Sequence, residues 1–134
     1  MNSSTLLYID DLPQMLELRK TALESLGYSV RTASSSLTAM TTLEQTRVAA
    51  VLLEYKQEGI DAEAVAIHIK QRFPNLPIIL LSAYSEVPGR MLWLVDEYIM
   101  KSELPGRLAP VIEKTARRLA SQNEEQVKRR GTAA

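Results

Sequence analysis

The apolar run at residues 48–53, Val-Ala-Ala-Val-Leu-Leu, leaves this chain few possible folds, because it stops abruptly at Glu54. A short and nearly continuous apolar run is typical of a strand that is buried on both faces, as in a parallel sheet covered by helices. The carboxyl edge of such a sheet is where ligands and chemistry collect. The pattern therefore predicts that Glu54 lies in a crevice at that edge.

Three other predicted strands also end in polar or charged side chains. They are Leu6–Ile9 before Asp10 and Asp11, Ile78–Leu81 before Ser82, and Glu97–Met100 before Lys101. A further strand, Tyr28–Thr32, is more polar than the first, which suits the edge of a sheet. Because parallel strands place their carboxyl ends at the same side of the sheet, we expect these acidic, hydroxyl and basic groups to meet there.

Helix signals separate the strands. The predicted helices are Pro13–Ser25, which Gly27 ends, Ser35–Gln45, Glu63–Arg72, which Asp61 caps and Pro74 ends, and one that begins at Leu104 and becomes regular near Pro110. Their expected buried stripes are Leu16, Leu23 and Leu26 in the first, Leu37, Met40 and Leu43 or Ala39 in the second, and Leu104, Leu108, Val111, Ile112, Thr115 and Leu119 in the last. Pro88-Gly89 interrupts residues 83–94, so any helix there is short.

These elements form repeats of a strand followed by a helix, which predicts an α/β fold with a doubly wound, five-stranded parallel sheet and right-handed crossovers. At 134 residues the chain has the length of one domain. We assign residues 1–120 to that domain and residues 121–134, which lose the apolar stripe, to a polar and flexible tail. The initiating Met1 and this tail suggest a free-standing domain.

Composition excludes several classes of function. Lys and Arg together number 16, as do Asp and Glu, so the chain has no general electrostatic footprint for nucleic acid or for an anionic membrane. Cysteine is absent, which excludes disulfides and thiolate metal sites. No apolar run approaches the length of a membrane span, and the N-terminus lacks a basic leader segment. A cytoplasmic location is therefore expected.

The motifs around the strand ends resemble the receiver domains of two-component response regulators, and the resemblance covers residues 6–119. The motifs are Leu-Leu-Tyr-Ile-Asp-Asp at 6–11, Gly-Tyr-Ser-Val at 27–30, Val-Leu-Leu-Glu-Tyr at 51–55, Pro-Ile-Ile-Leu-Leu-Ser-Ala-Tyr at 77–84 and Tyr-Ile-Met-Lys at 98–101. The resemblance implies a flavodoxin-like sheet with strand order 2-1-3-4-5. Compared with that family, the spacing from Ser82 to Lys101 is shorter by roughly one helical turn, which implies a shortened fourth helix.

The resemblance also implies roles for individual residues. In such domains an aspartate at the end of the third strand accepts a phosphoryl group from a histidine kinase with the help of Mg²⁺. The corresponding positions here are Asp10 and Asp11 as the acidic pair that holds Mg²⁺, Glu54 as the acceptor position, the backbone carbonyl of Lys56 as a further metal ligand, Ser82 and Lys101 as contacts to the phosphoryl oxygens, and Tyr98 as the aromatic switch residue. Mg²⁺ needs hard oxygen ligands, and a lysine neutralises the charge on the transferring group.

Glu54 departs from the aspartate of the family. The extra methylene carries the carboxylate toward Ser82 and Lys101 and away from the position for in-line attack. A misplacement of about 1 Å can cost about a hundredfold in rate, so we expect impaired acceptor chemistry. The same extension brings a negative oxygen close to where a phosphoryl oxygen would lie, and Glu54 is therefore expected to imitate the phosphorylated state. Ser102 replaces a proline that is usual after the lysine.

Each of these residues also has a plainer interpretation. The acidic pair could merely begin a helix, and Glu54 with Lys101 could form a structural salt bridge, which is compatible with mimicry. Trp93 and Tyr84 are expected to pack in the core or at its rim, although an exposed aromatic here would be a binding anchor. The basic residues within 117–130 are expected to form a solvated helix face.

Three functions remain open at this point. The first is a non-enzymatic interaction module: an atypical single-domain receiver that signals through protein contacts with a histidine kinase or a downstream signalling protein. The second is a receiver that is phosphorylated with the help of Mg²⁺. The third is a flavin or nucleotide binder of the same topology, which the acidic loop after the first strand and the lack of a glycine-rich phosphate loop disfavour. The resemblance leaves homodimerisation through the last helix and strand open.

Overall fold

Five parallel strands form one sheet in the order β2-β1-β3-β4-β5. The strands are β1 Thr5–Ile9, β2 Ser29–Ala33, β3 Ala50–Tyr55, β4 Ile78–Ser82 and β5 Glu97–Met100. The structure, a computed structural model, describes residues 4–56, 59–83, 86–104, 106–118 and 121. The predicted fold class and strand order are confirmed, and the more polar strand β2 lies at an edge of the sheet as expected.

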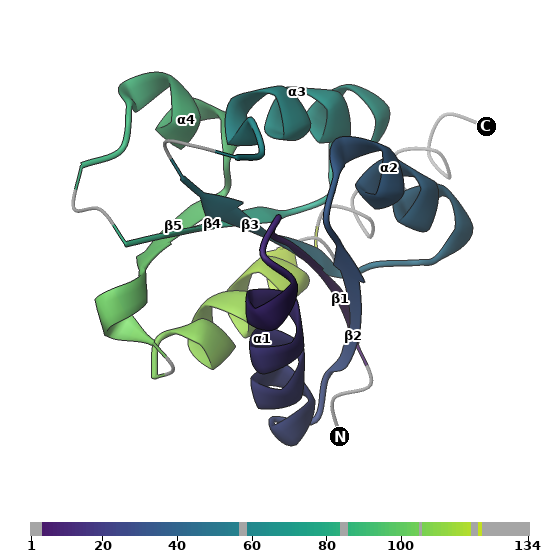
Figure 1. Ribbon diagram of the computed structural model, residues 1–134, viewed down its shortest axis with the longest axis vertical. Coiled ribbons are helices and arrows are strands. Elements are labelled where there is room, and N and C mark those ends of the chain that lie inside the picture. The colour runs from purple at the N-terminus through teal and green to yellow at the C-terminus, as the bar shows by residue number, and fades with distance from the viewer. Residues whose placement is uncertain (1–3, 57–58, 84–85, 105, 119–120, 122–134) are drawn as a thin grey trace.

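Helices cover both faces of the sheet (Figure 1). The helices α2 Ser36–Gln45, α3 Ala62–Arg72 and α4 Gly89–Leu94 lie on one face, and α1 Pro13–Ser25 and the helix at residues 108–118 lie on the other. A short 3₁₀ turn, Lys101–Glu103, follows β5. None of the described helices is both long and apolar enough to cross a bilayer.

Side chains of each inner strand alternate between two hydrophobic clusters. Leu7, Val51 and Leu80 belong to the cluster beneath α2, α3 and α4. Their chain neighbours in the strands, among them Leu52 and Ile79, belong to the cluster beneath α1 and the last helix. The central strands are therefore buried on both faces, which explains why their sequences are continuous apolar runs rather than alternating ones.

Local capping signals set the helix boundaries largely as predicted. Pro13 opens α1, where its missing N–H costs nothing, and Gly27 ends the turn after α1 with a φ of 99°. The Ser35 hydroxyl accepts a hydrogen bond from the backbone N–H of Thr38 at 3.1 Å and caps α2. Asp61 caps α3 in the same way. α4 is short, as the Pro88-Gly89 signal predicted.

Three residues that were predicted to face the core are exposed, so these predictions are wrong. Leu26 is 48% exposed because α1 ends at Ser25 and the chain turns before this side chain could join the stripe. Leu37 is 78% exposed, since it lies two residues, or about 200° around the helix, from the buried Ala39. Trp93 is 91% exposed for the same reason, because the short α4 buries Met91 on its opposite side.

The last helix carries its predicted stripe as far as the structure describes it. Leu108, Val111, Ile112 and Thr115 are buried, and the regular helix begins near Pro110 as expected. Leu119 and Tyr84 lie outside the described residues. So does the proposed tail at 121–134, apart from residue 121, and the boundary of the domain stays a prediction.

Candidate functional site

The carboxyl ends of the strands bring together most of the residues singled out from the sequence. Ile9 is in register with Leu53, so Asp10 and Glu54 follow on neighbouring strands. Ser82 is in register with Tyr55 on one side and with Met100 on the other. Lys101 follows directly after Met100 and begins the 3₁₀ turn. Short loops and strict register, rather than any single residue, create this convergence.

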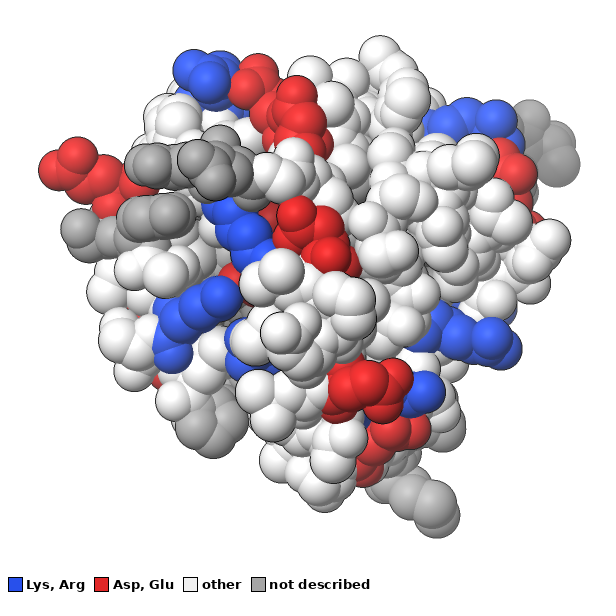
Figure 2. Space-filling model, in the orientation of Figure 1, with Lys and Arg blue, Asp and Glu red and all other residues white. Residues whose placement is uncertain are grey.

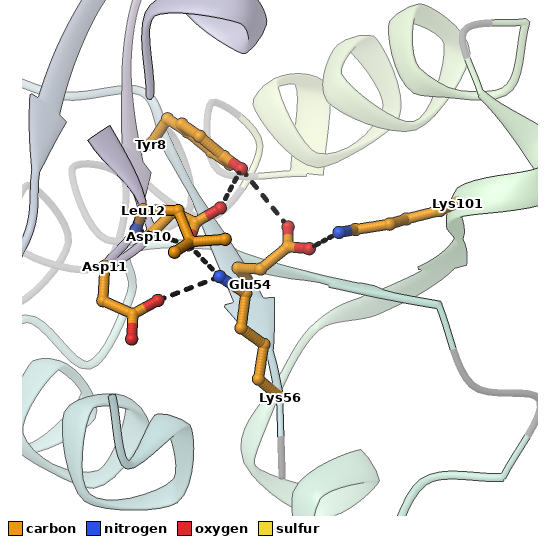
Figure 3. Close-up of polar contacts among 7 residues, drawn as sticks. All are labelled: Tyr8, Asp10, Asp11, Leu12, Glu54, Lys56 and Lys101. Atoms are coloured by element: carbon orange, nitrogen blue, oxygen red, sulfur yellow. Dashed lines mark hydrogen bonds and ion pairs between the residues drawn. The ribbon is translucent and has the colours of Figure 1, made fainter. Parts of the chain in front are cut away.

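Glu54 is a buried carboxylate with partners on both oxygens. It is 3% exposed, its Oε1 forms an ion pair with the Nζ of Lys101, and its Oε2 accepts a hydrogen bond from the hydroxyl of Tyr8 at 3.3 Å (Figure 3). Burial raises the pKa of Glu54, and the hydrogen bond and positive charge of Lys101 only partly offset that rise. The Glu54 carboxylate therefore lies between the ammonium of Lys101 and the hydroxyl of Tyr8.

Asp10 and Asp11 share the ammonium group of Lys56. The Nζ of Lys56 forms an ion pair with Asp10 Oδ1 and lies 2.9 Å from Asp11 Oδ1. Asp10, which is 1% exposed, also accepts hydrogen bonds from the Tyr8 hydroxyl at 2.8 Å and from the backbone N–H of Leu12 at 3.2 Å. The Leu12 contact is what remains of the plainer helix-start interpretation, since no side chain caps α1.

The pKa values within this group follow from the shared ammonium. The hydrogen bond from Lys56 lowers the pKa of Asp11 below its usual range. Burial alone would lower the pKa of Lys56, but its hydrogen bonds to both aspartates outweigh burial and raise it. Asp11 and Lys56 are therefore both charged at neutral pH.

Tyr8 connects the two ion pairs, and sequence analysis did not single it out. Its hydroxyl lies between Asp10 and Glu54 (Figure 3), and burial, together with the charge of Glu54, raises its pKa so that it stays a neutral donor. The guanidinium of Arg19 lies 5.7 Å from the centre of its ring. A signal was present in the sequence: residues two apart in a strand share a face, which places Tyr8 beside Asp10.

Gly59 packs closely against the acidic pair. Its φ of 95° lies in the region that favours glycine, and a Cβ at this position would overlap the Asp11 carboxylate. A side chain here would thus displace Asp11 from Lys56. Only glycine allows the loop before α3 to approach this closely.

Ser82 and Tyr98 occupy less direct positions. Ser82 is fully buried at the end of β4. Tyr98 in β5 is half-buried and packs against the cluster beneath α2, α3 and α4. Ser82 therefore lies at the edge where the charged groups gather, whereas Tyr98 lies on the side that faces α4.

The carboxylates of this site do not fit a Mg²⁺ ion in the arrangement described. Within the described ranges, no three side chains of the acidic, histidine or cysteine type are placed to hold a metal ion together. The two aspartates are engaged by Lys56, and Glu54 turns away from them toward Lys101 (Figure 3). The donor types suit Mg²⁺, but their directions suit two ammonium groups.

Comparison with known sequences identifies the relatives of this chain. The sequence model of the response regulator receiver domain matches residues 6–113. The transcriptional regulatory protein GlrR of Escherichia coli K12 is 32% identical over 83 residues, which make up 62% of this chain and 19% of GlrR. The probable transcriptional regulator ycf27 of Cyanidium caldarium is 28% identical over 121 residues, or 88% of this chain and 48% of that protein. The chain thus spans less than half of either relative.

Two solved structures of one response regulator share the fold over nearly the whole length of that protein. The response regulator protein TrrA of Thermotoga maritima, solved in complex with Mg²⁺-BeF, superposes with a TM-score of 0.74 and 31% identity, covering 84% of this chain and 98% of TrrA. TrrA has also been solved in complex with the histidine kinase ThkA, and that copy superposes with a TM-score of 0.74 over 84% of this chain and 97% of its own. The sheet order, the charged strand ends and the match over residues 6–113 agree, and this chain belongs to the response regulator receiver domain family.

Proposed function

We propose that this receiver domain works as a preset interaction module in two-component signalling. In this proposal Glu54 stands where the family has its phosphoaccepting aspartate, and its carboxylate replaces the phosphoryl group as the partner of Lys101. The observation that carries the proposal is the buried ion pair between Glu54 and Lys101. Signalling then depends on which proteins recognise the domain and not on its phosphorylation.

The ion pair supports the proposal because it holds Lys101 without any bound phosphate. The resemblance to the family implies that this lysine contacts a phosphoryl oxygen in a phosphorylated receiver. Here a negative oxygen already lies at bonding distance from its Nζ. Removing one partner of a buried ion pair leaves an uncompensated charge and is strongly unfavourable, so the pair has little freedom to open.

The surroundings of Glu54 also argue against a role as acceptor. A nucleophile needs a free oxygen aligned with the phosphorus atom. One oxygen of Glu54 is paired with Lys101 and the other accepts from Tyr8. These contacts fix the direction of both oxygens, and the extra methylene displaces the carboxylate from the position for in-line attack.

Protein partners are the expected ligands. TrrA binds the histidine kinase ThkA, and we propose that this chain likewise contacts a histidine kinase or a downstream signalling protein. On the face seen in Figure 2, acidic and basic side chains are interspersed, and among the described residues neither sign forms a continuous patch. A surface of this kind favours neither nucleic acid nor an anionic membrane as a partner.

Intact-mass spectrometry with a small phosphodonor tests the proposal. Wild type and Glu54→Gln are incubated with acetyl phosphate and Mg²⁺, and the expected result is no phosphoryl addition to either protein. The backbone amide spectrum of the wild type is expected to stay unchanged by the donor, since the site is already set. A phosphoryl group that is found on the wild type and is absent from Glu54→Gln overturns the proposal in favour of a phosphorylatable, Mg²⁺-dependent receiver.

A further inference from the structure

The side chain of Lys56 turns back over the sheet edge and ends between the two aspartates (Figure 3). We propose that its ammonium group is the resident cation of the acidic pair, and that it makes the site independent of a divalent ion. The inference extends the proposed function, because a preset site needs no ion to set it. It depends on different contacts, however, and is tested separately.

The acidic pair needs a positive charge at this position. Asp10 is almost completely buried and Asp11 is only partly exposed, so their mutual repulsion is weakly screened by water. An ammonium has three donors, and Lys56 directs two of them at one oxygen of each aspartate. Among the described contacts, no other cationic side chain reaches either carboxylate. The charge of Lys56 therefore holds the pair together.

The geometry sets Lys56 and a divalent ion in competition for one place. Mg²⁺ requires oxygen ligands at about 2.0–2.1 Å in a near-octahedral arrangement. A nitrogen that bonds both Asp10 and Asp11 already fills the space between their Oδ1 atoms. A Cβ at position 59 would overlap the far oxygen of Asp11, so the Asp11 carboxylate has this place only because residue 59 is glycine. Metal binding would therefore require the ammonium to leave.

The charge balance of the edge favours the same conclusion. Three carboxylates, from Asp10, Asp11 and Glu54, face two ammonium groups, from Lys56 and Lys101. A divalent ion added here would bring two more positive charges to a group that already holds two ammonium groups. Displacing Lys56 into water would relieve that repulsion but would break both of its ion pairs.

Removal of the ammonium should create Mg²⁺ binding that the wild type lacks. The test compares wild type, Lys56→Met and Lys56→Arg by isothermal titration with Mg²⁺ and by thermal unfolding with and without Mg²⁺ at matched ionic strength. Lys56→Met is expected to bind Mg²⁺ at least about tenfold more tightly than wild type, since a unit charge at contact distance contributes at least that factor. Its unfolding midpoint should rise with Mg²⁺, whereas those of wild type and Lys56→Arg should not.

Lys20→Met is the matched control. It removes the same charge from α1, about 12 Å along the helix from Leu12. It is expected to behave like wild type toward Mg²⁺. If Lys56→Met is too unstable to fold alone, its refolding on addition of Mg²⁺ counts as binding and supports the inference.

Two results would overturn the inference. One is saturable Mg²⁺ binding by wild type as tight as that of Lys56→Met, and the other is no gain of binding in a folded Lys56→Met. Either result leaves the proposed function standing if the wild type is still not phosphorylated. Phosphorylation of Glu54, conversely, overturns the proposed function whether or not Lys56 excludes Mg²⁺.

Discussion

At the scale of residues, the site is a set of buried charges in which every carboxylate has a specific partner. Asp10 and Asp11 are held by Lys56, and Glu54 is held by Lys101. The Tyr8 hydroxyl has one proton and lies closer to Asp10, at 2.8 Å, than to Glu54, at 3.3 Å. Glu54 therefore depends on Lys101 for most of its compensation.

Replacing Lys101 with methionine should destabilise the domain. The variant leaves the Glu54 carboxylate buried, with Tyr8 as its hydrogen-bond donor among the described contacts, and breaking a buried ion pair in this way costs about 3 kcal/mol. Urea unfolding of wild type and Lys101→Met measures the change. The double variant Lys101→Met, Glu54→Gln should recover most of the loss, because it removes the uncompensated charge. A loss below about 0.5 kcal/mol in the single variant would mean that Glu54 finds compensation elsewhere.

At the scale of elements, the loop between β3 and α3 fixes the acidic pair through Gly59. Replacing it with alanine adds a Cβ that overlaps Asp11 and places a non-glycine residue at a φ of 95°. The expected loss of stability is at least about 1–2 kcal/mol from the backbone alone. Gly89→Ala is the matched control: nothing lies within 4 Å of a Cβ there, so its effect should be neutral or slightly stabilising. Equal effects of the two substitutions in urea unfolding would contradict this account of Gly59.

One carboxylate of β5 forms ion pairs with two basic side chains of the last helix, beside the apolar packing of Ile99. Glu97 Oε1 lies 2.9 Å from Lys114 Nζ and 3.1 Å from Arg118 Nη2. Burial alone would raise the pKa of Glu97, but the two basic side chains outweigh it and lower the pKa. A carboxyl whose pKa is lower in the folded state stabilises the fold above its unfolded pKa of about 4.3 and loses that contribution as the pH falls through the folded value.

Comparison with Glu97→Gln isolates this pH dependence. The wild type should be more stable than the variant at neutral pH. The difference between their free energies of unfolding should shrink as the pH is lowered below about 4.3 and approach zero below the folded pKa. Urea unfolding across that range measures it. A difference that is constant with pH would show that Glu97 acts through its hydrogen bonds alone and not through its charge.

At the scale of the whole molecule, the backbone was more predictable than the orientation of its side chains. Apolar runs, Pro13, Gly27 and the capping residues are local signals, and they fixed the elements to within a residue or two. The side of a helix that faces the core depends on its neighbours. Leu37 and Trp93 were therefore placed wrongly, because two apolar residues on opposite sides of a short helix cannot both be buried.

In the candidate site, too, the positions of the residues along the backbone were predictable, and the direction of one long side chain was not. Strand ends located Asp10, Glu54, Ser82 and Lys101 at one edge, because this follows from the parallel register alone. The side chain of Lys56 was not foreseen, since a long flexible side chain can point in many directions and its choice depends on two aspartates distant in the sequence. Long-range charge complementarity carries little local sequence signal.

The central strands link the two hydrophobic clusters, so the described part of the domain should unfold as one unit. Neighbouring residues of β4 point to opposite faces. Ile79 belongs to the cluster beneath α1 and the last helix, and Leu80 belongs to the cluster beneath α2, α3 and α4. Neither helical layer can leave without exposing strands that the other layer still covers. Ile79→Ala and Leu80→Ala should each cost about 2–5 kcal/mol, as large-to-small substitutions in a core do.

Native-state hydrogen exchange tests whether a substitution in one hydrophobic cluster lowers the stability of the helices on both faces of the sheet. The slowest amides of α1 and of α3 should lose the same protection in both variants, although each substitution touches only one cluster directly. The expected equality follows from the sheet, since β1, β3 and β4 contribute side chains to both layers. Loss of protection confined to α3 in Leu80→Ala, or to α1 in Ile79→Ala, would show instead that the layers open separately and that the charged edge can be disturbed from one face alone.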